Sequence, residues 1–256
     1  MQAEMETAVG ACKAAGAFLR EGLGRAKNIQ HKGEINLVTV MDRECEATIV
    51  RIIREAFPDD DILAEEGSTG RRGAPRLWVV DPLDGTTNYA HNYPVFAVSI
   101  ALLVEGESVL GAVYDPMRDE LFTAQKGGGA RLGQAPIRVS DTPCVNTSLL
   151  GTGFPYDLRQ KPRLLLEHFG RFLFKAQALR RDGSAALNLC YVAAGRFDGF
   201  WETGIYPWDL AAGALIIQEA GGRVTDYRGR PFDPFSGEIL ASNGLIHKEM
   251  VEILEE

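Results

Sequence analysis

Apolar residues in this sequence follow two kinds of spacing, and the segments that carry them alternate along the chain. Residues 4–24 carry apolar residues at helical intervals, and a second helix is expected from Asp42, as its N-cap, to Ala56. Leu77–Val80 is instead a continuous apolar run, which predicts a buried strand. Because helices and strands alternate, the chain favours layered α/β packing.

The middle of the chain is rich in expected hairpins. Apolar runs at Val95–Val104 and Ser108–Tyr114 are separated by a Glu-Gly-Glu turn, and Leu121–Ala124 adds a further strand. Ile62–Ala64 predicts a short strand, and residues 25–41 are expected to be irregular. In the second half we expect helices over 163–174, 184–194, 208–220 and 247–255, and strands over 148–150, 176–179, 197–201 and 239–241 and near Val224.

Chain length limits the number of domains. At ~150 residues per domain, 256 residues correspond to one large domain or to two halves that share a core. No internal repeat, low-complexity tract or long linker divides the sequence. We therefore predict a single domain over residues 1–256, with an N-terminal half of about 1–140, a C-terminal half of about 141–256 and the functional site between them.

Composition excludes several classes of protein. With 45% hydrophobic and 24% charged residues, the chain has enough apolar surface to fold, and its net charge of −8 disfavours nucleic-acid binding through a basic face. The four cysteines form no C-x-x-C pair, which disfavours a zinc site or a disulfide framework. The acidic N-terminus is unlike a signal peptide, and no apolar stretch is long enough to cross a bilayer. We expect a cytoplasmic protein that contacts neither nucleic acid nor membrane.

The segment from Asp81 to Asn88 carries the strongest chemical signal. It directly follows the buried strand, and a tight turn can aim Asp81 and Asp84 at one point. Two carboxylates that close repel each other unless a cation lies between them or one takes a proton. A helix that starts at Gly85 would direct free N–H groups to the same place, and such groups hold phosphate. This combination predicts metal ions beside a phosphate group.

Two further acidic segments support this interpretation. Asp, Pro, Gly and Thr all form turns, so the segment alone is also consistent with a surface turn. Glu65, however, ends the short strand before it, where the two strand ends could lie side by side. Asp209 opens an apolar helix, where it could serve as N-cap, as ligand or as both.

Taken together, these segments resemble the inositol monophosphatase family over most of the chain. The resemblance implies the fold of that family, a five-layer αβαβα sandwich of the inositol monophosphatase and fructose bisphosphatase type. It also implies a homodimer. The matching segments are Asn36–Thr39 with Asp42, Ala64–Gly67, Trp78–Asn88, Gly183–Ala186, Trp208–Asp209 and Glu219–Gly222.

The resemblance also implies two or three Mg²⁺ ions per site. Glu65, Asp81 and the carbonyl of Leu83 resemble the ligands of a first ion, and Asp81, Asp84 and Asp209 those of a second. Glu65 would help to hold a weaker third ion. Asp84 is included among the catalytic residues.

The remaining roles come from the same resemblance. Glu65 and Thr86 look like the pair that orients and deprotonates the attacking water, and the amides of Gly85 and Thr86 would hold the phosphate. Asp42 and Lys32 match positions near a mobile loop at the metal site. Residues that match contacts to inositol or sugar are Gly183, Ser184, Ala185, Glu202 and Asp209.

The expected activity is Mg²⁺-dependent hydrolysis of inositol 1-phosphate. Alternatives on the same fold are fructose 1,6-bisphosphate, 3′-phosphoadenosine 5′-phosphate and histidinol phosphate, and the resemblance also implies lithium sensitivity. A haloacid-dehalogenase-like phosphatase would use Asp81 as nucleophile, but its acids lie two residues apart rather than three. A regulatory binding protein is the alternative of a different class, since some bacterial relatives contact the transcription machinery.

Several other signals have ordinary explanations. Lys126–Ala130 lacks the ending of a phosphate-binding loop and predicts a turn between strands. The four histidines are scattered, although His91 is near enough to the Asp81 turn to meet substrate. Arg180 and Arg181 are either a solvated pair or a contact for a substrate phosphate, and the sequence does not decide between the two.

Overall fold

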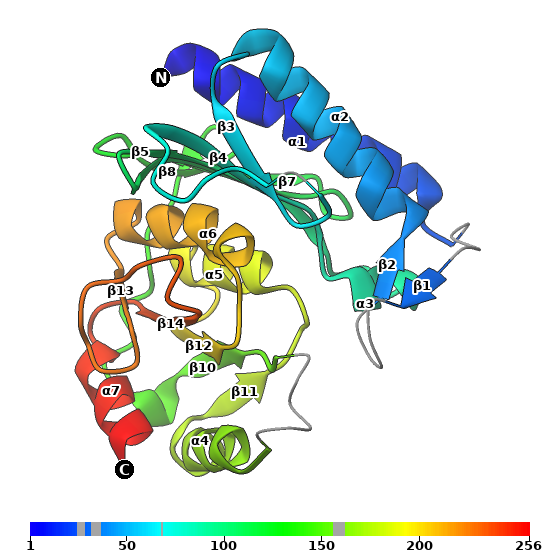
Figure 1. Cartoon of the computed structure of the whole chain (residues 1–256). Coiled ribbons are helices and arrows are strands. Elements are labelled where there is room, and N and C mark those ends of the chain that lie inside the picture. Colours follow the sequence, from blue (N-terminus) through cyan, green and yellow to red (C-terminus); the bar gives the residue numbers. More distant parts are fainter. Residues whose placement is uncertain (25–28, 32–36, 68, 156–161) are drawn as a thin grey trace.

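The computed structural model describes residues 1–24, 29–31, 37–67, 69–155 and 162–256. In this part of the chain, five layers are stacked (Figure 1). Helices α1 (Gln2–Gly22) and α2 (Val40–Ala56) cover the outer face of a first sheet. Helices α5 (Ala185–Ala193) and α6 (Pro207–Glu219) lie between this sheet and a second one, and α4 (Pro162–Lys175) and α7 (His247–Glu255) cover the far side.

The first sheet is mixed and supplies the strand that ends at the acidic motif. Strand β3 runs parallel to β4, and the later strands continue as antiparallel hairpins. Among the described residues its order is β3 (Asp61–Ala64), β4 (Arg76–Asp84), β5 (Ala97–Val104), β6 (Glu107–Asp115), β7 (Glu120–Gln125), β8 (Gly129–Leu132) and β9 (Ala135–Pro136).

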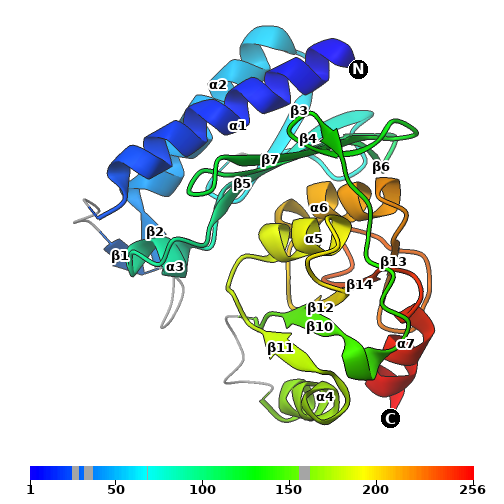
Figure 2. The same ribbon diagram turned by 180° about the vertical axis from the view of Figure 1, so that it is seen from behind.

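The second sheet lies on the other side of α5 and α6, which Figure 2 shows from behind. Its central strand β12 is parallel to β10 and antiparallel to β14. Within the described ranges its order is β11 (Ala178–Arg180), β10 (Leu149–Thr152), β12 (Gly199–Thr203), β14 (Glu238–Ser242) and β13 (Arg223–Thr225), and a 3₁₀ helix, η1 (Val145–Thr147), precedes β10.

Apolar clusters fill the spaces between the layers. Trp78 belongs to the cluster between the first sheet and α1 and α2, and Leu189 to the one around α5 and α6. The third cluster joins the second sheet to α4 and α7, where the rings of Phe172 and Trp201 stack with centroids 4.0 Å apart. Strands β4 and β5 are buried on both faces, which explains why their sequences are continuous apolar runs.

The expected layered sandwich is confirmed, and most differences lie at the ends of elements. Helix α2 begins at Val40, so Asp42 lies in its first turn and is not its N-cap. The prediction that 25–41 is irregular is wrong for β1 (Ile29–His31) and β2 (Leu37–Thr39), which pair with each other, and for Val40 and Met41, which begin α2. Three-residue strands give too few positions for a periodic signal. Of the turn expected at Lys126–Ala130, residues 126–128 join β7 to β8, and Gly129 and Ala130 belong to β8.

Cys12, Cys45, Cys144 and Cys190 are free thiols, and the first, second and fourth of them are buried. Burial raises the pKa of the Cys45 thiol to about 12, which keeps it protonated. Among the described helices, none combines the length and the apolar character that a membrane crossing requires. Both observations concern only the parts of the chain that the structure describes.

Candidate active site

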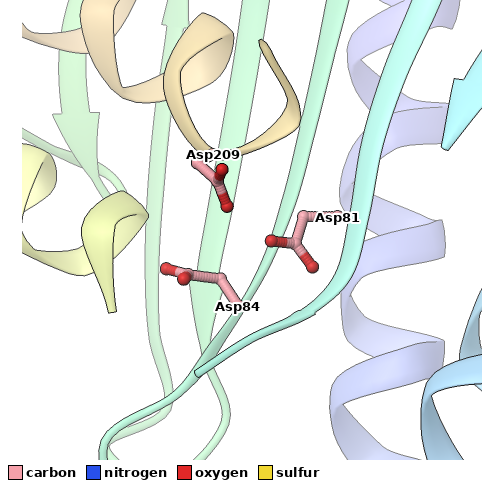
Figure 3. A group of neighbouring side chains, drawn as sticks. All are labelled: Asp81, Asp84 and Asp209. Atoms are coloured by element: carbon pink, nitrogen blue, oxygen red, sulfur yellow. The ribbon is translucent and has the colours of Figure 1, made fainter. Parts of the chain in front are cut away.

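Strand β4 brings two aspartates to one side of the sheet by an irregularity in its pairing. Asp81 pairs with Ser99 and Asp84 with Ala97, so three steps along β4 match two steps along β5. In a regular strand, residues three apart point to opposite faces, and one extra residue removes that difference. Both side chains are buried, and Figure 3 shows their carboxylates turned toward the same space.

Helix α6 supplies the third carboxylate from the opposite side. Asp209 lies in its first turn, where Oδ2 accepts a hydrogen bond from the backbone N–H of Tyr206 at 2.9 Å. This bond fixes the side chain, and the positive end of the helix dipole favours its charge. Ligand oxygens of Asp81, Asp84 and Asp209 all lie within 4.8 Å of one another (Figure 3), and we call these three residues the acidic cluster.

The acidic cluster is electrostatically unfavourable without a cation. Burial, followed by the charges of Glu65, Asp84 and Asp209, holds the pKa of Asp81 well above its usual range. Burial likewise raises the pKa of Asp84 to about 6, and burial together with Asp84 raises the pKa of Asp209. A cation placed among the three groups would offset both the burial and the repulsion.

The hydrogen bonds of Asp81 fit such an ion. Its Oδ1 accepts from the N–H of Leu83 at 2.9 Å, whereas Oδ2 is buried and has no hydrogen-bond partner among the described residues. A buried carboxylate oxygen without a partner destabilises the fold. Hard carboxylate oxygens are the ligands that Mg²⁺ prefers, so the donor set suits a divalent ion of this kind.

The N-terminus of α5 fixes Asp84. The carboxylate accepts from the hydroxyl of Ser184 and from the N–H groups of Ala185, at 3.3 Å, and Ala186, at 2.8 Å. These donors lower the pKa of Asp84 and offset part of the rise caused by burial. The second half of the chain therefore orients an aspartate that comes from the first half.

The turn after Asp84 depends on glycine. Gly85 has φ of 99°, a conformation that residues with a side chain rarely adopt, and helix α3 (Thr86–Ala90) begins directly after it. The hydroxyl of Thr86 lies 3.0 Å from Oδ1 of Asp42 and 3.1 Å from the carbonyl of Leu83. A hydroxyl has one proton to donate, so these two acceptors share it and the lone pairs of Thr86 stay available.

Glu65 directly follows β3, which lies beside β4, close to where the sequence predicts it. Ala64 pairs with Val80, and the N–H of Glu65 donates to the carbonyl of Val80 at 3.3 Å. Its charge is near enough to raise the pKa of Asp81. Glu65 is nevertheless not one of the three residues of the acidic cluster, so its side chain stands further out than theirs.

A family comparison agrees with this architecture. The model of the inositol monophosphatase family matches residues 1–256. The chain belongs to this family. Its phosphatases act on small phosphate esters and generally depend on metal ions.

Individual relatives align over nearly the whole chain. The inositol-1-monophosphatase of Synechocystis sp. is 47% identical over 259 residues, which cover 99% of this chain and 89% of the relative. The Nus factor SuhB of Vibrio cholerae is 42% identical over 246 residues, with 95% and 92% covered. The structure of an inositol monophosphatase from Anabaena (Nostoc) sp. has a TM-score of 0.91 and 45% identity, and the match covers 99% of this chain and 96% of that one.

A pocket opens beside the acidic cluster of this family member. Every residue for which the resemblance implies a sugar or inositol contact lines it, namely Gly183, Ser184, Ala185, Glu202 and Asp209. Asp84 and Gly85 line it as well, which brings the expected phosphate and metal positions to the same cavity. The structure thus assembles these residues, while their roles stay predictions.

The carboxylate of Glu202 lies against Gly153, where the glycine has no side chain. A Cβ on Gly153 would lie 2.1 Å from Oε2 of Glu202, so a side chain at residue 153 would displace this carboxylate. Burial raises the pKa of Glu202 to about 8, although Arg181 lowers it and Asp84 adds to the rise. At neutral pH the group is mostly protonated and can both donate and accept a hydrogen bond.

The two arginines have different surroundings. Arg181 lines the pocket, whereas Arg180 is exposed and donates to the carbonyl of Leu179 at 2.9 Å. Exposed His91 is absent from the residues that line the pocket, so the suggested substrate contact has no support within the described residues. Lys32 lies outside the described residues.

Sequence reasoning missed several residues of the pocket. Phe154 and Pro155 follow β10, Tyr206 precedes α6, and Asn188 lies in the second turn of α5. The rings of Tyr206 and Trp208 stack with centroids 4.9 Å apart, which stiffens that side of the entrance. A Gly-Phe-Pro or a helical Asn has no distinctive chemical pattern, so only the fold could identify them.

Proposed function

We propose that the protein is a Mg²⁺-dependent phosphomonoester hydrolase that converts inositol 1-phosphate and water to inositol and phosphate. The observation that carries this proposal is the acidic cluster beside the pocket, with one buried oxygen of Asp81 that has no hydrogen-bond partner in the described part of the chain. When bound, the divalent ions would lower the pKa of water and neutralise charge on the transferred phosphate. Residues of the chain would hold the ions, orient and deprotonate the water, and hold the phosphate group.

Two groups of ligands are proposed. Asp81 would serve both ions, with Glu65 and the carbonyl of Leu83 on one side and with Asp84 and Asp209 on the other. The shared role is supported by the two oxygens of Asp81, of which only Oδ1 has a hydrogen bond to the backbone. Glu65 would contribute to a weaker third site, which agrees with its position outside the acidic cluster.

Thr86 and Glu65 would orient and deprotonate the attacking water. The Thr86 proton is directed to Asp42 or to the carbonyl of Leu83, so the hydroxyl oxygen can accept a hydrogen bond from water. Glu65 would then take the proton that the water loses. The amides of Gly85 and Thr86 would hold the phosphate group. No covalent phosphoenzyme is needed, which separates this mechanism from that of haloacid-dehalogenase-like enzymes.

The pocket favours a substrate with one phosphate. Arg181 is the only cationic side chain among the described residues that line it. A second phosphate in this pocket would have Arg181 as its only cationic partner among the described lining residues. Fructose 1,6-bisphosphate and 3′-phosphoadenosine 5′-phosphate are therefore weaker candidates, and histidinol phosphate stays an alternative.

Other parts of the proposal come from the sequence alone, through its length, its composition and the family resemblance. We propose a single domain over residues 1–256, a homodimer, a cytoplasmic location and inhibition by lithium. A regulatory role stays the alternative of a different class, and a relative 42% identical carries the name Nus factor SuhB. Retention of Glu65, Asp81, Asp84 and Asp209 supports catalysis in this chain.

Phosphate release by the purified protein tests the activity and the substrate together. Inositol 1-phosphate, fructose 1,6-bisphosphate, 3′-phosphoadenosine 5′-phosphate and histidinol phosphate would be compared with Mg²⁺, and the variant Asp84→Asn would serve as the blank. We expect the fastest Mg²⁺-dependent release from inositol 1-phosphate. If a folded protein that binds Mg²⁺ releases phosphate from none of the four, the proposed activity is wrong.

A further inference from the structure

Two buried asparagines of this protein have opposite surroundings. Asn243 is 4% exposed, and its side-chain amide donates to Ser140 and Thr142 while Oδ1 accepts from the N–H groups of Leu245 and Ile246. Asn188 is 1% exposed, yet its Oδ1 has no hydrogen-bond partner among the described residues. A buried amide oxygen of this kind lowers stability unless something else supplies the donor.

The position of Asn188 shows where that donor would come from. It lies one turn after Ser184, whose carbonyl accepts from the N–H of Asn188 at 3.1 Å. Residues four apart share one face of a helix, so Asn188 follows the residue whose hydroxyl holds Asp84. Both residues line the pocket beside the acidic cluster. The missing donor would therefore belong to a molecule in this pocket.

Hydrogen-bonding chemistry limits which kind of group could donate to Oδ1 of Asn188. A phosphate dianion has only acceptor oxygens, so it cannot satisfy Oδ1 of Asn188. The proposed substrate has a second kind of group, the hydroxyls of its polyol ring, and each of them can donate one hydrogen bond. A site with a buried acceptor discriminates against substrates that lack the matching hydroxyl, because the acceptor then stays unpaired.

We propose that Asn188 is a specificity-determining residue whose Oδ1 accepts a hydrogen bond from a hydroxyl of the bound polyol phosphate. This inference rests on the proposed phosphatase function and names one residue that selects its substrate class. It also explains why the protein keeps a polar side chain in a buried position where an apolar one of similar shape would be more stable.

The variant Asn188→Leu removes the acceptor and keeps the approximate shape of the side chain. Activity would be measured on inositol 1-phosphate and on cyclohexyl phosphate, which has the same ring without the hydroxyls. We expect KM for inositol 1-phosphate to rise about tenfold, the scale of one lost hydrogen bond, with little change in kcat. The kinetic constants for cyclohexyl phosphate should change by less than twofold, and the melting temperature should equal or exceed that of the wild type.

Two matched variants separate a substrate contact from a structural role. Tyr191→Phe removes the Tyr191 hydroxyl, another buried polar atom that has no hydrogen-bond partner within the described ranges. Tyr191 is not among the residues that line the pocket. This variant should leave the ratio of the two activities unchanged. Asn243→Leu removes an asparagine that is fully hydrogen-bonded and should lower the melting temperature. If Asn188→Leu lowers the melting temperature as Asn243→Leu should, Asn188 is structural and the proposal is wrong.

The failure of this inference can be told from the failure of the proposed function. If the wild type hydrolyses neither ester, the proposed function fails. If the wild type hydrolyses inositol 1-phosphate and Asn188→Leu changes both substrates equally, only the role of Asn188 is overturned. Asn188→Ala provides a second variant in case the leucine does not fit, and the same selective rise in KM is required of it.

Discussion

The acidic cluster and the opposite side of the pocket differ in how the chain builds them. Asp81 and Asp84 belong to one strand and converge because β4 has one extra residue relative to β5. Arg181, Asn188 and Glu202, which we call the polar wall, come from the segment after β11, from α5 and from β12. One local motif therefore prepares the metal and phosphate chemistry, whereas substrate choice depends on elements that only the fold brings together.

This comparison predicts that substitutions in the acidic cluster and in the polar wall change the activity in different ways. Loss of an acidic residue should affect every phosphate ester equally, because all of them share the reacting phosphate. Loss of a residue of the polar wall should change the preference among esters and leave the common chemistry in place. The variants below are ordered from the largest expected effect to the smallest.

Asp84→Asn should lower kcat by at least ~10²-fold on every substrate, because it removes one charge of the proposed metal site. Steady-state kinetics at saturating Mg²⁺ measure this. Asp59→Asn, a change at an exposed aspartate in the turn after α2, is the matched control and should keep wild-type activity. Activity of Asp84→Asn within threefold of the wild type would contradict the role of the acidic cluster.

Removal of metal should change stability through the same residues. Mg²⁺ at 100 times its dissociation constant would stabilise the wild type by about 2.7 kcal/mol, because it binds only the folded state. In Asp84→Asn the shift should be much smaller, and without metal this variant should melt at a higher temperature because a buried charge is gone. Thermal unfolding with EDTA and with Mg²⁺ tests both statements, and equal shifts in the two proteins would contradict them.

Glu202→Gln should give a stability difference that depends on pH. The ordinary pKa of this carboxyl is 4.5 and burial raises it to about 8 in the folded protein. Between these values the unfolded state loses the proton first, so the wild type loses stability as pH rises from 4.5 to 8. The glutamine variant has no such dependence.

The advantage of Glu202→Gln over the wild type should therefore grow by about 4 kcal/mol between pH 4.5 and pH 8 and level off above that pH. Denaturant unfolding of both proteins without metal at a series of pH values measures this difference. The other carboxylates are present in both proteins, so their contributions cancel except for the repulsion that couples Glu202 to Asp84 and Asp209. A constant or shrinking advantage from about pH 5 to 8 would show that Glu202 is not buried as described.

Arg181→Gln should have the smallest effect. The side chain is exposed, and exposed ion pairs contribute at most about 1 kcal/mol, which corresponds to a change of about fivefold. We expect KM for inositol 1-phosphate to rise within that limit while kcat stays unchanged. Initial-rate kinetics at low salt, where such contacts are strongest, test it. If the variant instead lowers kcat about a hundredfold, Arg181 belongs with the acidic cluster.

The same comparison shows what the sequence could predict. Asp81, Asp84 and Asp209 were identifiable because carboxylates at the ends of buried apolar segments form an unusual pattern, and the alternation of elements indicated the layered sandwich. The sequence predicts that a tight turn brings Asp81 and Asp84 together, whereas an irregular strand pairing produces this convergence. Register shifts depend on the neighbouring strand, so periodicity within one strand cannot predict them.

Asn188 shows why the polar wall was harder to predict. An asparagine inside a helix has many explanations, and its significance appears only when the fold shows a buried oxygen without a partner among the described residues. The support of Asp84 by α5 was missed for a similar reason, because Ser184 and Ala186 lie about one hundred residues away in sequence. Contacts of that range depend on tertiary packing and not on local spacing.

The central claim is that the acidic cluster holds the divalent ions of a phosphatase. A crystal of this protein soaked in Mn²⁺, which takes the same oxygen ligands as Mg²⁺, would test it by anomalous scattering. The account predicts ions bound by Asp81, Asp84 and Asp209, one of them at Oδ2 of Asp81, and their loss in Asp84→Asn crystals. Intact crystals with no ion at the acidic cluster, or with ions bound only elsewhere, would contradict it.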